Sequence, residues 1–248
     1  MADNKPKLEH EHTPVAIKAR LEAATSHSYL GDFILGAVDG TVTTFAVVAG
    51  VAGAAFSGPV ALVLGLANLV ADGFSMAVGN YLSVKSDRQV IERIRAIEQN
   101  HIDAEPEGER EEIRQIFAAK GFEEPLLGQI VEVITQDHKR WIDTMVTEEW
   151  GQPLETPSPV KAGMVTFIAF AVAGFVPLAP YCLPLGLSVE TKFQISAVIT
   201  ALTFFVIGLA KGYVVRRSAW RAGLETLFIG GAAAVLAYFV GTLFRGVI

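Results

Sequence analysis

The chain has 248 residues, of which 51% are hydrophobic and 19% charged, with a formal net charge of −6 and a mean hydropathy of +0.40. The apolar residues cluster in long blocks, which is typical of a multi-span membrane protein rather than of a soluble domain. The single cysteine, Cys182, excludes an internal disulfide and a zinc site of the Cys-x-x-Cys type.

The N-terminal residues 1–28 are polar and contain no apolar core, so they do not read as a signal peptide. We expect them to form a polar tail, with the first span directing the chain to the membrane. Five later segments reach the roughly 20 apolar residues that a spanning helix needs. They cover residues 31–56, 59–82, 161–182, 193–215 and 222–244.

Turn-forming residues separate these segments. Ser57, Gly58 and Pro59 mark a tight turn between the first two spans, and Pro177 and Pro180 predict a broken end of the third. The pattern therefore predicts an all-α membrane protein with five transmembrane helices and one large insert. The expected divisions are a tail at 1–28, spans 1 and 2 at 29–82, an acidic domain at 83–160 and spans 3 to 5 at 161–248.

Basic residues are distributed unevenly between the two sides of the membrane. Of the 20 Lys and Arg residues, 18 lie in the tail, in residues 83–161 or in the connection 211–221, and only Lys192 and Arg245 lie on the opposite side. The positive-inside rule then predicts a cytoplasmic N-terminus and a cytoplasmic insert. We expect a bacterial plasma membrane, with a vacuolar membrane as the alternative.

Asp39 lies inside the first apolar segment, about 12 Å from its start at a rise of about 1.5 Å per residue. A carboxylate there costs about 2.5–3.5 kcal/mol, which favours a role in a transport pathway. The alternative is a buried ion pair, for which Lys211 is the available partner. Met76 lies at a similar depth on the antiparallel second span, and Asp72 lies one turn further in on the same face.

A carboxylate beside a thioether accepts a transition metal better than Na⁺ or Mg²⁺. Asp39, Met76 and Asp72 are therefore the candidate pathway residues, with Asp39 and Met76 as metal ligands. Simple packing is the alternative interpretation of Met76.

The insert at residues 83–160 carries 17 acidic and 9 basic residues. Its periodicity predicts three amphipathic helices, at 84–104, 108–120 and 125–150, the first of which continues the second span. Glu98 and His101 are spaced i, i+3 on one helix, and Glu109 and Glu112 are spaced in the same way on the next, so each pair shares a face. The candidate metal ligands of the insert are Glu98, His101, Glu109 and Glu112, together with Glu148 and Glu149 at the end of the third helix and Met145 one turn before them.

Carboxylates together with an imidazole suit a divalent first-row metal such as Fe²⁺, Mn²⁺ or Zn²⁺. The alternative for any single glutamate is a solvated acidic helix face. Acidic pairs on several helices of one bundle repel each other unless something neutralises them, which favours the metal site for the set.

Three stretches together resemble the vacuolar iron transporter family. They are Gly36–Gly40 (Gly-Ala-Val-Asp-Gly), Ala71–Ser86 with its Ser-Met-Ala-x-Gly-x-Tyr core, and Gly174–Tyr181 with Pro-Leu-x-Pro-Tyr. The likeness extends from residue 28 to 245 in the same order of spans and insert. It implies a five-span homodimer that exchanges cytoplasmic Fe²⁺ for protons along a path between the protomers, lined by Asp39 and Met76.

The same resemblance implies that the insert collects metal through glutamates matching Glu98, Glu109, Glu112 and Glu149, with Met145 beside the last. His101 stands where plant members carry another glutamate, and Asn80 stands where many bacterial members carry one. No ferritin-like domain precedes the spans, so oxidase activity is not implied.

We therefore expect a proton-coupled exporter of Fe²⁺, with Mn²⁺ as a second candidate substrate, working in a lipid bilayer as a homodimer. We expect no enzyme activity, no cofactor and no nucleic-acid partner. The alternative function is a non-transporting membrane protein that senses or buffers metal, or docks a partner. Ca²⁺ as the substrate is disfavoured, because it prefers oxygen ligands alone whereas Met76 and His101 offer sulfur and nitrogen.

Overall fold

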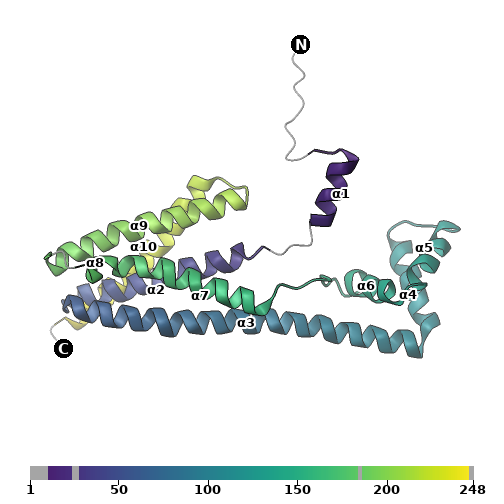
Figure 1. The fold of residues 1–248 in the computed structure, drawn as a ribbon, viewed down its shortest axis with the longest axis horizontal. Coiled ribbons are helices and arrows are strands. Elements are labelled where there is room, and N and C mark those ends of the chain that lie inside the picture. Colours follow the sequence, from purple (N-terminus) through teal and green to yellow (C-terminus); the bar gives the residue numbers. More distant parts are fainter. Residues whose placement is uncertain (1–10, 24–27, 184–185, 246–248) are drawn as a thin grey trace, which may run out of the picture. The chain divides into compact units, whose positions relative to one another are not determined.

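The computed structural model describes residues 11–23, 28–183 and 186–245, and these ranges are helical without any strand (Figure 1). Residues 1–10 and 24–27 of the predicted tail, 184–185 and 246–248 lie outside the described residues. The helices are α1 Pro14–Ala23, α2 Leu30–Gly53, α3 Gly58–Ala104, α4 Pro106–Ala119, α5 Leu126–Thr135, α6 His138–Glu148, α7 Pro159–Phe175, η1 Val176–Leu178, α8 Ala179–Cys182, α9 Val189–Val214 and α10 Ala219–Phe244.

The described chain forms two compact units. The first, called the acidic unit here, combines the described residues before Tyr29 with Ile94–Thr156, and the second, called the membrane unit, combines Tyr29–Arg93 with Pro157 onward. The continuous helix α3 contributes its first part to the membrane unit and its last part to the acidic unit. The prediction that the helix at 84–104 continues the second span is confirmed.

Five helices of the described residues are long and apolar enough to cross a membrane, as predicted, and all of them lie in the membrane unit except the last part of α3. Their ranges are Leu30–Gly53, Gly58–Ala104, Pro159–Cys182, Val189–Val214 and Ala219–Phe244. The predicted broken end of the third span is also confirmed, because η1 interrupts the helix at Pro177 before the short helix α8. Proline has no amide hydrogen to donate, so the regular helix cannot continue unchanged through it.

Close backbone contact fixes the position of α2, which carries Asp39. A Cβ atom at Gly40 would lie 2.4 Å from the carbonyl oxygen of Phe170 on α7, and one at Gly241 of α10 would lie 2.2 Å from the carbonyl oxygen of Gly50 on α2. Small residues allow helices in a membrane to approach this closely, and packing replaces the hydrophobic effect there. Helix α2 is therefore held between α7 and α10.

In the acidic unit, α4, α5, α6 and the end of α3 share an apolar core of Ile102, Ile113, Val131, Ile134, Trp141 and Met145. The single helix predicted at 125–150 is wrong, because the structure has α5 and α6 with a break between them. Asp137 adopts an extended conformation at the break, and its side chain accepts a hydrogen bond of 2.8 Å from the Arg140 amide. This N-cap starts α6 as a separate helix after the break.

Candidate metal site

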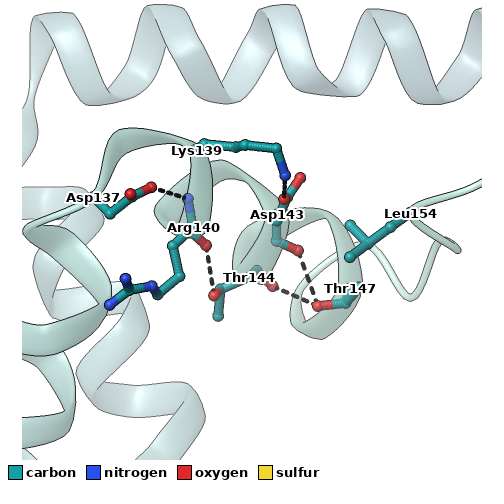
Figure 2. Close-up of a pocket in the computed structure, with 7 residues that line it drawn as sticks. All are labelled: Asp137, Lys139, Arg140, Asp143, Thr144, Thr147 and Leu154. Atoms are coloured by element: carbon teal, nitrogen blue, oxygen red, sulfur yellow. Dashed lines mark hydrogen bonds and ion pairs between the residues drawn. The ribbon is translucent and has the colours of Figure 1, made fainter. Parts of the chain in front are cut away.

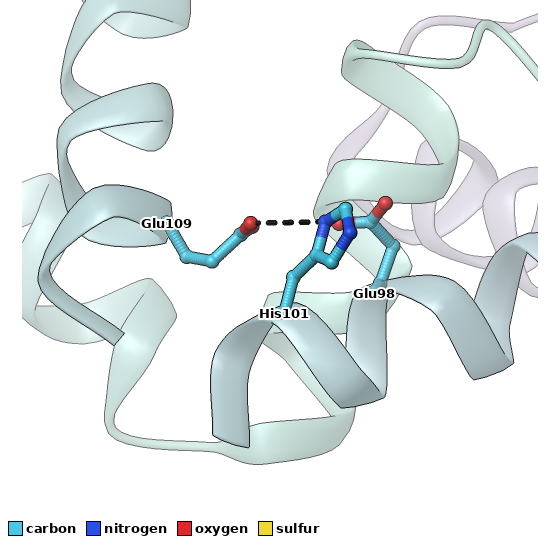
Figure 3. A group of neighbouring side chains, drawn as sticks. All are labelled: Glu98, His101 and Glu109. Atoms are coloured by element: carbon cyan, nitrogen blue, oxygen red, sulfur yellow. Dashed lines mark ion pairs between the residues drawn. The ribbon is translucent and has the colours of Figure 1, made fainter. Parts of the chain in front are cut away.

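Three side chains of the acidic unit converge on one point (Figure 3). Glu98, His101 and Glu109 each offer a ligand atom, and these atoms lie within 4.8 Å of one another. Glu98 and His101 come from the last turns of α3, one turn apart on the same face. Glu109 comes from the first turn of α4, which starts with Pro106 immediately after the break between the helices at Glu105. This break brings Glu109 next to Glu98 and His101, which the sequence alone does not reveal.

The two carboxylates of this cluster are buried, which is unusual for acidic residues. Glu98 is 1% exposed and Glu109 is 5% exposed, whereas the His101 side chain is exposed to solvent. The Oε2 atoms of both glutamates are buried and have no hydrogen-bond partner in the described part of the chain. Among the same residues, neither glutamate pairs with Lys or Arg; the His101 ring nitrogen Nδ1 lies 3.3 Å from Oε1 of Glu109. A buried, unpaired carboxylate is costly, so a proton or a bound cation would stabilise it.

Burial, followed by repulsion from Glu112, Glu98 and Glu149, raises the pKa of Glu109 to about 7, with His101 acting in the opposite direction. Burial and the charges of Glu98 and Glu112 also raise the pKa of Glu149. Four of the predicted ligands, Glu98, Glu109, Glu112 and Glu149, are therefore close enough for their charges to repel one another. A divalent cation there would relieve the repulsion and favour the ionised forms.

The remaining predicted ligands occupy different surroundings. Glu112 and Glu149 are exposed, near enough to Glu109 to act on its charge. Met145 is fully buried and packs in the apolar core with Ile113 and Trp141. The assignment of all the candidate residues of the insert as metal ligands stays a prediction.

Sequence reasoning missed Trp150, which contacts the cluster directly. Its indole Nε1 donates a hydrogen bond of 2.8 Å to Oε1 of Glu98, 52 residues earlier in the chain. The only available signal was a tryptophan immediately after the acidic pair Glu148 and Glu149, and that signal does not reveal the partner.

The acidic unit also contains a pocket of about 340 Å³, whose carboxylates have partners, unlike those of Glu98 and Glu109 (Figure 2). Its lining residues are Asp137, Lys139, Arg140, Asp143, Thr144, Thr147 and Leu154. Asp143 pairs with both Lys139 and Arg95, and Asp137 is occupied as the N-cap of α6. Burial acts to raise the pKa of Asp143, but the hydrogen bonds and charges of Lys139 and Arg95 outweigh it and lower the pKa. No carboxylate in this pocket lacks a partner, so it is a poor cation site.

The predicted pathway residues lie in the membrane unit. Asp39 on α2 and Asp72 and Met76 on α3 are all half-buried, and the two aspartates are close enough for their charges to repel each other. Met76 also packs against the apolar core of the unit. No ion pair joins Asp39 to Lys211 within the described ranges, so the buried-pair alternative gains no support from the structure.

Asn80 connects three of the spans. Its side-chain amide donates to Oδ1 of Asp32 on α2 at 2.7 Å and to Oγ1 of Thr166 on α7 at 2.8 Å. An amide in this position supplies donors that a glutamate cannot, so Asn80 acts as a link between helices.

The sequence profile of the VIT family matches residues 30–242, from the start of α2 almost to the end of α10. The match covers most of the chain, including all five long helices and the acidic insert. The chain belongs to the VIT family. Its curated relatives bear the names of transporters and not of enzymes.

This VIT family member is similar to a "Vacuolar iron transporter 1" of Arabidopsis thaliana, with 35% identity over 86% of this chain and 85% of the relative. A "Vacuolar iron transporter" of Toxoplasma gondii is 32% identical over 90% of this chain and 77% of the relative. A third relative, "Vacuolar iron transporter 1" of Oryza sativa subsp. japonica, is 30% identical over 96% of this chain and 92% of the relative. These likenesses support metal transport by a multi-pass membrane protein.

Proposed function

We propose that this VIT family member exports Fe²⁺ from the cytoplasm in exchange for protons, with Mn²⁺ as a second substrate. The observation that carries the proposal is the pair of buried carboxylates, Glu98 and Glu109, whose Oε2 atoms have no partner beside His101. The names of the relatives, all vacuolar iron transporters, support iron as the metal.

The acidic unit is the collecting site of this proposal. Glu98, His101 and Glu109 form its centre, and Glu112, Glu149 and Met145 complete the ligand set as the ion arrives. Carboxylate oxygens and an imidazole nitrogen suit Fe²⁺, which readily accepts both. The excess of Lys and Arg on the N-terminal side of the spans supports a cytoplasmic location for this unit.

Asp39, Met76 and Asp72 form the pathway through the membrane. The half-buried aspartates have no basic counter-ion in the described part of a single chain, which favours a metal ion or a proton as the neutralising partner. We further propose a homodimer in which Asp39 and Met76 of two copies face one path. Exchange follows if Asp39 releases the metal when it takes up a proton from the far side.

The test is Fe²⁺ flux into proteoliposomes across an imposed pH gradient. We expect wild-type flux to depend on the gradient and Asp39→Ala to abolish it almost completely, while Co²⁺ still binds to the acidic unit. Flux that persists in Asp39→Ala would contradict the pathway. A wild-type protein that binds metal but moves none under any gradient would instead support the sensor or buffer alternative.

The compartment requires a separate measurement. We retain a bacterial plasma membrane, with the N-terminus inside, as the expected location, although the relatives are named for vacuoles. Protease protection of an N-terminal tag in sealed, right-side-out vesicles tests the orientation, and a tag digested from outside would contradict it.

A further inference from the structure

Trp150 holds one oxygen of the most deeply buried glutamate in the acidic unit. Its indole N–H donates to Oε1 of Glu98 at 2.8 Å, and Oε2 of the same carboxylate is buried without a partner. Glu98 is only 1% exposed, so its carboxylate is shielded from bulk water. The indole also interacts with the carboxylate of Glu149, which precedes it in the chain. The two oxygens of Glu98 are therefore in different chemical situations.

We propose that Trp150 is a positioning residue that makes Glu98 a one-oxygen ligand and thereby selects the metal. The indole keeps Oε1 engaged, so that only Oε2 is free to enter the coordination shell beside His101 and Glu109. This inference rests on the proposed function, because it takes the cluster of Glu98, His101 and Glu109 as a metal site.

The selectivity follows from how different ions use carboxylates. Ca²⁺ takes 6–8 oxygen ligands at about 2.3–2.6 Å and often binds both oxygens of one carboxylate. First-row transition metals take fewer ligands and accept imidazole nitrogen, which Ca²⁺ does not favour. A carboxylate with one oxygen already hydrogen-bonded offers Ca²⁺ too few ligands, yet it suffices for Fe²⁺ or Co²⁺. Trp150 and His101 therefore both disfavour Ca²⁺ relative to Fe²⁺ or Co²⁺.

The hydrogen bond from Trp150 matters because its acceptor, Glu98, is buried, although the Trp150 side chain itself is 41% exposed. Without its N–H, Oε1 of Glu98 would be a buried acceptor with no partner, and the carboxylate would turn both oxygens toward an incoming ion. Groups that hold a metal ligand in this way typically change affinity by about 10–100-fold when they are removed. Trp150→Phe deletes the N–H while keeping an aromatic ring of similar shape.

The acidic unit provides a control in Trp141. Trp141 is 3% exposed and its Nε1 has no acceptor in the described part of the chain, so Trp141→Phe deletes a buried indole N–H, whereas Trp150 is 41% exposed. It packs in the apolar core and does not contact Glu98 through that nitrogen. The two substitutions differ in whether the lost N–H holds a proposed metal ligand.

The experiment titrates purified full-length protein in detergent with Co²⁺, a stand-in for Fe²⁺ that resists oxidation, and separately with Ca²⁺. For Trp150→Phe we expect the Co²⁺ affinity to fall by about 10–100-fold, with the Ca²⁺ affinity unchanged or higher. The ratio of Co²⁺ affinity to Ca²⁺ affinity should therefore fall by at least the same factor. Trp141→Phe should leave that ratio at its wild-type value. Equal losses for both ions would indicate a merely structural role of Trp150 and overturn the inference, as would unchanged binding.

A double-substitution cycle separates this inference from the proposed function. If Trp150 acts through Glu98, then Trp150→Phe should have little further effect on Co²⁺ affinity once Glu98→Gln is present. Additive losses would overturn the inference and leave the metal site standing. A wild-type protein that binds no Co²⁺ would overturn the metal site, and the inference with it.

Discussion

At the scale of single residues, several carboxylates of the acidic unit pair with basic side chains. Arg114 pairs with Glu124 and Lys120 pairs with Glu148. Glu98 and Glu109, in contrast, are buried and keep one oxygen each without a partner in the described residues. A folded protein tolerates such groups when a ligand completes them or when they take up a proton. A proton or a bound cation would therefore stabilise these two carboxylates.

The burial of Glu109 makes the stability of the folded protein depend on pH. Its pKa is raised from 4.5 to about 7, so the folded state holds the proton more tightly than the unfolded chain does. The resulting stability is fully present below pH 4.5 and is lost as the pH rises through about 7. Glu109→Gln, which cannot ionise, should raise the unfolding temperature of the metal-free protein at pH 8 by several °C, at about 2–4 °C for each kcal/mol. The difference should nearly vanish at pH 4.5.

Thermal melts of the metal-free protein in detergent measure this difference. The exposed residue Glu123 supplies the control, since Glu123→Gln should shift the unfolding temperature little at either pH. A Glu109→Gln protein less stable than wild type at pH 8 would contradict the burial argument.

At the scale of elements, helix packing places the candidate residues. Gly40 stands next to Asp39 and lets α2 lie against the backbone of α7. Gly40→Ala should separate the two helices, because its Cβ would lie 2.4 Å from the Phe170 carbonyl oxygen, and overpacking of this kind typically costs about 1–3 kcal/mol. We expect a lower unfolding temperature in detergent together with reduced metal flux.

Gly79 on α3 is the matched control for Gly40. A Cβ atom there would meet nothing within 4 Å, so Gly79→Ala should be neutral or slightly stabilising. If both substitutions behave alike, the α2–α7 contact does not limit the stability of the membrane unit.

At the scale of the whole molecule, folding, metal and protons are linked. The ligands bind metal in their deprotonated forms, so metal affinity should fall as the pH drops through about 7, where Glu109 takes up its proton. Co²⁺ at about 100 times its dissociation constant should add about 2.7 kcal/mol of stability at pH 7.5. At the same concentration it should add much less at pH 5.5. Unfolding temperatures with and without Co²⁺ at both pH values check this, and equal shifts would contradict it.

The sequence by itself determined the class of the molecule. Five apolar segments of spanning length predicted the five spans, because a bilayer sets a minimum helix length that composition reveals directly. Pro177 predicted the broken third span for a local steric reason. The i, i+3 spacing also grouped Glu98 with His101, because one helix fixes which of its residues share a face. Local rules suffice for each of these features.

Only the tertiary structure decided which faces meet. The break between α3 and α4 at Glu105 sets Glu109 beside Glu98 and His101. The N-cap at Asp137 divides a helix that periodicity predicted as one. The contact of Trp150 with Glu98 spans 52 residues, and no local pattern encodes it. Periodicity determines which residues share one face of a helix, but turns and core packing determine which faces of different helices meet. The candidate metal site depends on the contact between faces of different helices.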